Sequence, residues 1–456
     1  MTPRKIAFAM ALAIAYTTLP TPLVAQEQAQ VERPLPTEHA ERKALFDAEI
    51  DELAADLLGN HPRPFMHIPE SDFRALVEKS KASLSGQSSK ADLLWAFNRI
   101  IAAIGCGHTR MDYFIQEDKE IRVDQRFPLD VQIFNDRLYV RNGLVNSDRV
   151  KPGDEIISVN GLPVEQLLKT IYQRVPADGY NPNFRRAVAN TWLTSYLTYA
   201  LQFPENYEVT LRHGYRKTTL KPLKEWSFPP IVPPYFKCQD GFCAEFEDGG
   251  AIAVLSLRHW NYYGEALSDF KAKIDRLRAQ MDQNGSKALI IDVRGNLGGS
   301  GLAGDYLLRQ LSDASCAYFS ADSNGDESLK RERSSTKTPF AGSVFYLSNG
   351  LTNSATGHFL AMADAMDDGI IVGTNSGNGF TVNDGAADFR SSRLGIRYRI
   401  ARLVFSISSD RHTQADGVTP HYEVRQTVLD ELSGKDAQYE QALQLARESI
   451  ADEKAR

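Results

Sequence analysis

From Ala251 onward the chain alternates short apolar runs with helical segments, and this alternation restricts its fold more than any other feature. The apolar runs have the length of strands, and the segments between them show the three- and four-residue spacing of helices. The expected strands are 252–257, 288–293, 343–348 and 369–373, and the expected helices are 270–281, 302–311 and 354–366. Such a pattern is typical of an α/β domain with a largely parallel sheet, in which ligands bind beyond the carboxyl ends of the strands.

Two smaller regions precede this α/β domain, which we place at 245–450. Apolar residues at helical spacing predict a small α-helical domain at 37–115. From Phe127 the apolar period changes to two, which predicts strands and an α+β domain at 125–225. The stretch 152–161, Pro-Gly-Asp-Glu-Ile-Ile-Ser-Val-Asn-Gly, resembles the second half of a PDZ domain. We see no glycine-rich loop of the kind with which PDZ domains bind a C-terminal carboxylate.

The first 25 residues have the layout of a secretory signal peptide. Arg4 and Lys5 form a basic region, residues 6–16 are almost wholly apolar, and Ala25 provides a small residue for cleavage. The apolar run is shorter than the roughly 20 residues that a bilayer span needs, and no later stretch could cross a membrane. We therefore expect a periplasmic or secreted protein with no stable membrane insertion after signal cleavage.

The charge of the chain bears on its partners, and its cysteines bear on disulfide formation and metal binding. The formal net charge is −6 and basic residues form no stripe, which argues against nucleic acid as a partner. Cys238 and Cys243 are close enough in sequence for a local disulfide in an oxidising compartment. Cys106 and Cys316 are expected to be free and buried. No further ligands occur at metal-ligand spacing, so we expect no metal and no cofactor.

The strongest local signal is a strand that ends in a glycine-rich turn. The run Leu289-Ile-Ile-Asp-Val-Arg294 continues through Asn296 to the pair Gly298-Gly299. Paired glycines let the backbone approach a ligand and present N–H groups to it. A phosphate-binding loop is not predicted, because neither the GxGxxG spacing nor a following Lys-Ser/Thr pair is present.

A second strand runs through a short polar turn into a helix whose first residues include Ser354. At a helix N-terminus, free N–H groups and the helix dipole stabilise negative charge. The same position suits an ordinary N-cap, which is the commoner role of serine after a turn. This segment by itself favours the N-cap.

Taken together, the two segments resemble peptidase family S41. The motif residues are Asp292, Arg294, Asn296, Gly298 and Gly299, then Thr352-Asn-Ser354-Ala355, then Val372-Gly373-Thr374 with Ser376-Gly377. The order of helical, PDZ-like and α/β domains also fits, and the resemblance implies a catalytic domain of the crotonase/ClpP-like ββα superhelix type. It further implies that Ser354 is the nucleophile. The oxyanion hole would consist of the backbone N–H of Ala355 and that of Gly298 or Gly299.

The general base differs from that of the tail-specific proteases, the best-known branch of the family. These use a lysine in a Gly-Lys-Gly turn, which here reads Gly377-Asn378-Gly379, and asparagine cannot accept a proton. The Tricorn-like branch uses a histidine from the helical domain, and the segment Gly105-Cys-Gly-His108-Thr109 resembles that site. The resemblance therefore implies His108 as the base, although a lone histidine is more often structural.

The resemblance to the Tricorn-like branch also implies an acid that orients the histidine, just before Gly417. Gln414 occupies the family position there, and Asp416 or Asp410 is the nearest acidic substitute. His358, one turn into the helix after Ser354, is expected to be structural because it points away from the helix N-terminus.

These observations predict an exported serine endopeptidase that cleaves polypeptides through an acyl-enzyme on Ser354, with His108 as general base. One alternative is a catalytically silent S41-like protein that binds peptides or a small hydrophobic ligand. Another is an esterase or amidase that uses the same site. The charged, serine-rich segment 319–339 is a candidate lid or a disordered segment.

Overall fold

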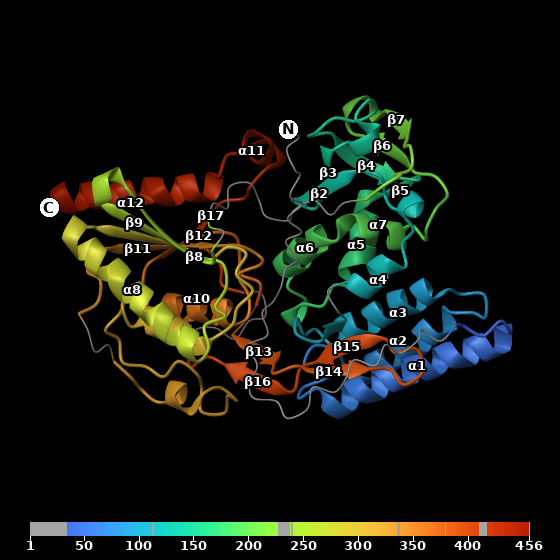
Figure 1. Cartoon of the computed structure of the whole chain (residues 1–456), viewed down its shortest axis with the longest axis horizontal. Helices are drawn as coiled ribbons and strands as arrows, with labels where there is room; N and C mark the ends of the chain where they lie inside the picture. The colour runs from blue at the N-terminus through green and yellow to red at the C-terminus, as the bar shows by residue number, and fades with distance from the viewer. Residues whose placement is uncertain are drawn as a thin grey trace, which may run out of the picture.

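The computed structural model describes residues 34–111, 114–226, 238, 240–334, 338–378, 380–409 and 417–455. The expected signal peptide, Gly379 and Asp416 lie outside these residues. Three regions follow one another along the chain: helices at one end, a small sheet with its own helices, and a larger parallel sheet between helical layers (Figure 1). Among the described residues, no helix is long and apolar enough to cross a membrane.

The first region consists of helices α1 (His39–Asn60), α2 (Glu70–Ala82) and α3 (Lys90–Ala103). Its core also contains residues from much later in the chain. Strand β1 (Arg110–Met111) pairs with β15 (Arg397–Ile400), which pairs with β14 (Ala387–Arg390). Tyr398 and Ile400 are buried in the same cluster as the helices. The helical region is thus completed by an arm of the later domain, which the sequence analysis did not predict.

The second region is an antiparallel sheet with strand order β2-β3-β4-β6-β7. Its strands are β2 (Asp130–Phe134), β3 (Arg137–Asn142), β4 (Glu155–Val159), β6 (Glu208–Leu211) and β7 (Lys217–Thr219), with β5 (Leu162–Pro163) paired to β4. Its helices are α4 (Ile115–Lys119), α5 (Val164–Tyr172), α6 (Pro182–Thr191) and α7 (Leu193–Ala200). The change of apolar period therefore correctly indicated strands.

The third region contains a six-stranded sheet with order β17-β12-β11-β10-β9-β8. The strands are β8 (Phe242–Glu247), β9 (Ile252–Leu257), β10 (Ala288–Asp292), β11 (Ser343–Ser348), β12 (Ile370–Gly373) and β17 (Tyr422–Glu423). All neighbours are parallel except β8 and β9, so the prediction of a largely parallel sheet is confirmed.

Helices cover both faces of this sheet (Figure 1). Helices α8 (Glu265–Asn284), α9 (Gly301–Leu308) and α10 (Ala355–Ala365) pack on one face. Helix α12 (Ala437–Ala455) packs on the other, after the short helix α11 (Val428–Ser433). Parallel strands buried on both faces are continuous apolar runs, which is why they could be recognised in the sequence.

Strands β13 (Thr381–Asp384) and β16 (Leu403–Ser406) form a separate antiparallel pair between the parallel sheet and the helical region (Figure 1). The described part of the segment 319–339 is not a free lid, because Phe319 and Leu329 are buried in the core beside α9. The Phe319 N–H donates to the Leu329 carbonyl at 2.9 Å, which closes the segment on itself.

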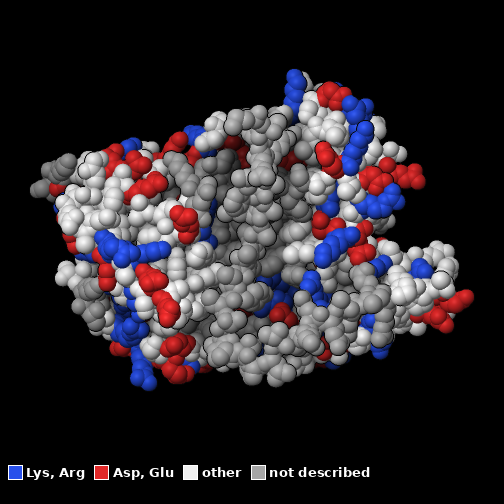
Figure 2. All heavy atoms as spheres, in the orientation of Figure 1, with Lys and Arg blue, Asp and Glu red and all other residues white. Residues whose placement is uncertain are grey.

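The disulfide between Cys238 and Cys243 is present. Cys106 is free and buried as expected, whereas Cys316 is only partly buried. On the face drawn in Figure 2, acidic and basic side chains alternate over both halves of the molecule rather than gather by sign.

Candidate active site

Ser354 occupies a strained turn between β11 and α10. It immediately precedes the helix, with φ 55° and ψ −130°, a backbone conformation that favours glycine. Its side chain makes no capping hydrogen bond. The N-cap role that the segment alone favoured is therefore wrong. A non-glycine residue in such a conformation costs on the order of 1–3 kcal/mol, and strained strand-to-helix turns are known to present nucleophilic serines.

Asn296, which is fully buried, fixes the glycine-rich turn against the turn that carries Ser354. Its carbonyl accepts from the Asn353 N–H at 3.0 Å, and its side-chain oxygen accepts from Thr356 Oγ1 at 2.8 Å. The same oxygen accepts from the Gly298 N–H at 3.0 Å. The backbone and side chain of this one residue thus join the end of β10 to both sides of Ser354.

Close contacts leave no room for a side chain at Gly298 or Gly299. Their φ values are +106° and +143°. A Cβ atom on Gly299 would lie 2.3 Å from the carbonyl group of Trp260. The backbone there is tied to Trp260, whose N–H donates to the Gly298 carbonyl at 2.9 Å. A side chain at either glycine would push the turn out of place.

Arg294 of the same motif has a structural role. Its guanidinium is buried and binds Asp292 through Nε and Nη2, at 2.9 and 2.7 Å. It also binds both carboxylate oxygens of Asp436 at 2.7 and 2.8 Å, just before α12. The Asp-x-Arg element therefore joins the end of β10 to the C-terminal helix.

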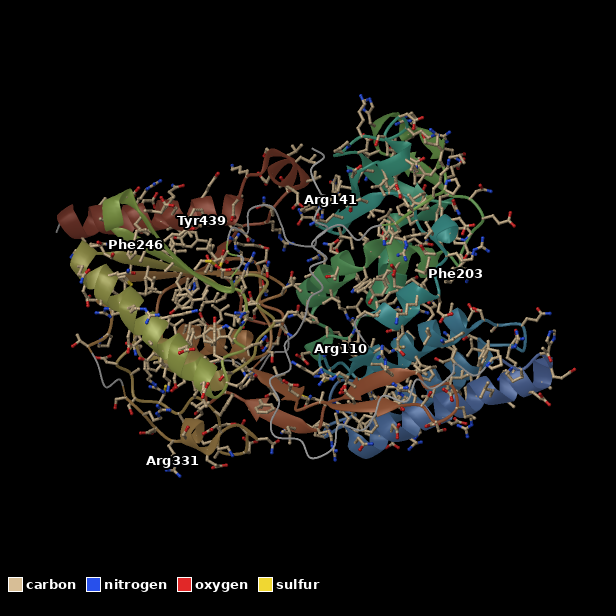
Figure 3. All side chains as sticks on the ribbon, in the orientation of Figure 1. Arg110, Arg141, Phe203, Phe246, Arg331 and Tyr439 are labelled. Atoms are coloured by element: carbon tan, nitrogen blue, oxygen red, sulfur yellow. A yellow bond between two sulfur atoms is a disulfide. The ribbon has the colours of Figure 1, made fainter. Side chains whose placement is uncertain are left out.

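His108 lies in a turn between α3 and β1 that is fastened to the later domain. Thr109 Oγ1 accepts from the Ala401 N–H at 3.0 Å, and Cys106 Sγ donates to the Asn383 carbonyl at 3.5 Å. Figure 3 labels Arg110, two residues after His108, at this junction between the helical region and the β13–β16 strands. The His108 side chain is largely buried.

His108 also lies near the first turns of α10. The pKa of His358, on that helix, is lowered to about 4, chiefly by burial and further by repulsion from His108. His358 is buried and its ring contacts Phe319, in keeping with the structural role expected for it. Asn378, which stands where the tail-specific branch has lysine, is buried against Gly357 on the same helix.

Two acidic residues that the sequence analysis missed lie beside His108. Asp384 ends β13, and its Oδ2 is 3.5 Å from His108 Nε2. Asp178 lies between α5 and α6, is buried, and interacts electrostatically with His108. Gln414, Asp410 and Asp416 lie outside the described residues. Neither Asp178 nor Asp384 belongs to a recognisable motif, so only the packing of distant segments reveals them.

Within the described part of the chain, no group of three or more His, Cys, Asp or Glu side chains could hold a metal ion.

Comparisons with known proteins agree with this architecture. The model of peptidase family S41 matches residues 251–424, and a PDZ domain model matches residues 124–229. No curated protein matches the chain. Solved structures of the same fold do match it. A crystal structure of mature CPAF has 15% sequence identity and a TM-score of 0.55, and covers 87% of this chain and 96% of that one.

Mature CPAF complexed with lactacystin has 14% identity and a TM-score of 0.56, over 88% of this chain and 98% of that one. A putative peptidase from Parabacteroides merdae has 14% identity and a TM-score of 0.48, over 88% and 96%. At these identities the likeness to the two CPAF structures concerns the fold. The family match therefore identifies residues 251–424 as a peptidase family S41 domain, which follows a PDZ domain at residues 124–229.

Proposed function

We propose that the chain is an exported serine endopeptidase with Ser354 as nucleophile and His108 as general base. The observation that carries this proposal is the strained, uncapped position of Ser354 in front of α10. A serine used only for capping would accept a hydrogen bond from the helix, and this one does not. The strained backbone is therefore best explained if it holds the Ser354 hydroxyl group toward a substrate.

The proposed reaction uses Ser354 and His108 in turn. Ser354 Oγ attacks the peptide carbonyl carbon while its proton passes to the His108 imidazole. The tetrahedral intermediate then expels the amine, which takes the proton from His108 and leaves an acyl-enzyme. Water, deprotonated by His108, attacks the ester and restores the serine.

The developing oxyanion needs fixed donors, and the contacts of the two turns narrow the choice. The Gly298 N–H already donates to Asn296 Oδ1. The proposed oxyanion hole therefore consists of the N–H groups of Gly299 and Ala355. The Ala355 N–H lies at the start of α10, where the helix dipole adds to the stabilisation.

The PDZ domain supports a polypeptide substrate, since PDZ domains bind extended peptides by strand addition. The disulfide between Cys238 and Cys243 fits an oxidising compartment, as expected if residues 1–25 direct export. Expression with the full N-terminus followed by intact-mass analysis tests export, because the mature periplasmic or secreted protein should begin at Gln26.

Labelling with a fluorophosphonate probe tests the site. We expect one adduct per molecule on the parent, detected by intact mass, and none on Ser354→Ala or His108→Ala. Ser348→Ala is the matched control, because this nearby buried serine donates to the Thr374 carbonyl and should not react. Labelling that persists in Ser354→Ala would contradict the proposal.

A second candidate function is a catalytically silent peptide-binding protein, which the asparagine at position 378 favours over a Ser–Lys enzyme. Absence of any adduct on a folded parent, together with binding of peptides, would support it. Hydrolysis of small esters but not of peptides by a labelled parent would instead indicate an esterase.

A further inference from the structure

Asp178 is a buried carboxylate that contacts the turn carrying His108. It opens the short helix η3 (Asp178–Tyr180) and is 4% exposed. Its Oδ1 accepts a hydrogen bond from the Gly107 N–H at 2.9 Å. The residue directly before His108 is thus held by this acid.

Two atoms beside this contact lack hydrogen-bond partners. Asp178 Oδ2 and His108 Nδ1 are both buried, and neither has a partner among the described residues. Native structures leave few buried polar atoms unsatisfied, so each such atom needs an explanation. Burial raises the pKa of Asp178, whereas attraction to His108 and the Gly107 hydrogen bond lower it.

The turn that contains Asp178 is fastened on both sides of the site. The Gly179 N–H donates to the Gly105 carbonyl at 3.0 Å, on the side of the base. Asn181 Nδ2 donates to the Ser376 carbonyl at 3.0 Å, and the neighbouring Gly377 N–H donates to the Thr352 carbonyl at 2.8 Å. The carboxylate therefore stands on an element that is linked to the segments of both His108 and Ser354.

We infer that Asp178 is the positioning residue for the general base and that its Oδ2 accepts a hydrogen bond from His108 Nδ1–H during catalysis, a contact that the structure itself does not contain. This inference rests on the proposed function. This hydrogen bond would satisfy both unpartnered atoms and would select the tautomer whose Nε2 can take the proton of Ser354. A carboxylate at this place also stabilises the imidazolium that forms.

Asp384 does not fit the positioning role that we assign to Asp178. Its side chain is 38% exposed and lies 3.5 Å from Nε2, the nitrogen that must exchange protons with Ser354 and the leaving group. A carboxylate there does not fix the tautomer required for catalysis. Since Asp178 lies within the segment matched by the PDZ model, the active site would combine residues from all three regions of the chain.

Asp178→Asn is the informative substitution, with Asp384→Asn as its matched control. Asparagine keeps the volume and the acceptor for Gly107, but its amide favours the opposite tautomer of His108. We expect fluorophosphonate labelling of Asp178→Asn to be slower by on the order of 10²–10⁴-fold at an unchanged melting temperature. Asp384→Asn should slow labelling less than Asp178→Asn does, and the reverse order would overturn the inference. A parent-like rate for Asp178→Asn would overturn the inference.

A readout that does not depend on activity separates this inference from the proposed function. In protein labelled with ¹⁵N-histidine, the ring signals of His108, identified by their loss in His108→Gln, report its tautomer. We expect Nδ1–H in the parent and in Asp384→Asn, and Nε2–H in Asp178→Asn. The parent signal decides the matter even if Asp178→Asn does not fold, because an unprotonated Nδ1 in neutral His108 would overturn the inference. A parent with Nδ1–H that takes no probe would contradict only the proposed function.

Discussion

Gly298 and Ser354 lie in such close contact that a Cβ atom at position 298 would be 2.6 Å from the Cβ of Ser354. The same atom would be 3.0 Å from the Ala355 nitrogen, one of the proposed oxyanion donors. The glycine therefore sets the distance between the turn after β10 and the start of α10. Any side chain there must move one turn relative to the other.

Gly298→Ala should consequently abolish activity more readily than it unfolds the protein. We expect the labelling rate to fall by at least about 10²-fold, the effect of losing one oxyanion donor. The positive φ adds a moderate loss of stability. Probe labelling and thermal unfolding measured on the same sample check both expectations. Gly249→Ala is the control, because it has a φ of +68° but open space around its Cβ. Equal labelling rates for the two variants would refute the close-contact argument.

Arg294→Met should destabilise the protein strongly. The change leaves the carboxylates of Asp292 and Asp436 without their buried partner, which typically costs about 3–5 kcal/mol. The urea midpoint of unfolding measures the loss. Arg447→Met, which removes an exposed pair with Asp248, should shift that midpoint far less. A similar shift in both variants would mean that Arg294 does not hold α12 to the sheet.

The α/β domain could be predicted from the sequence because its signals are local. The run Leu289–Ile291 is buried on both sides of the sheet, so it reads as a strand without knowledge of its neighbours. Ser354 could be located because its turn and the turn after β10 both carry motif residues. Its strained backbone could not be predicted, since it depends on Gly298 and Asn296 packing against it.

The residues around His108 could not be predicted from local sequence signals. Asp178 and Gly107 are 71 residues apart in the chain, and the docking of one region onto another brings them together. The arm of β14 and β15 is another example. Its strands are short, and nothing near Tyr398 indicates that this ring fills the core of helices that begin at His39. Both contacts are products of tertiary packing between distant segments.

Replacement of Cys238 and Cys243 by serine should lower the free energy of unfolding by about 2 kcal/mol, because the disulfide closes only a short loop. The parent, unfolded without reductant and alkylated, should gain two alkyl groups, on Cys106 and Cys316. Chemical unfolding and intact mass check the two statements. Cys316→Ser serves as the control, since it leaves the disulfide in place. Four alkyl groups on the secreted parent would contradict the oxidised state.

Asp368 gives a stability that depends on pH. Burial raises its pKa to about 6, although a hydrogen bond from Tyr346 lowers it. In the unfolded chain an aspartate titrates near pH 4. Folding therefore favours the protonated form, so this contribution is complete below about pH 4 and is lost as the pH rises to about 6. The difference between the pKa values of Asp368 in the folded and unfolded protein corresponds to at most roughly 3 kcal/mol of folding free energy.

Asp368→Asn removes this titration while it keeps a neutral partner for Tyr346. The melting temperature of the variant should equal or trail that of the parent at pH 4 and exceed it by several degrees at pH 7. Other groups titrate in both proteins and cancel in the comparison, so the change with pH belongs to position 368. A difference between the two proteins that stays constant from pH 4 to 7 would mean that Asp368 is ionised at no cost in the folded protein. Water would then have to hydrate the Asp368 carboxylate beside Tyr346.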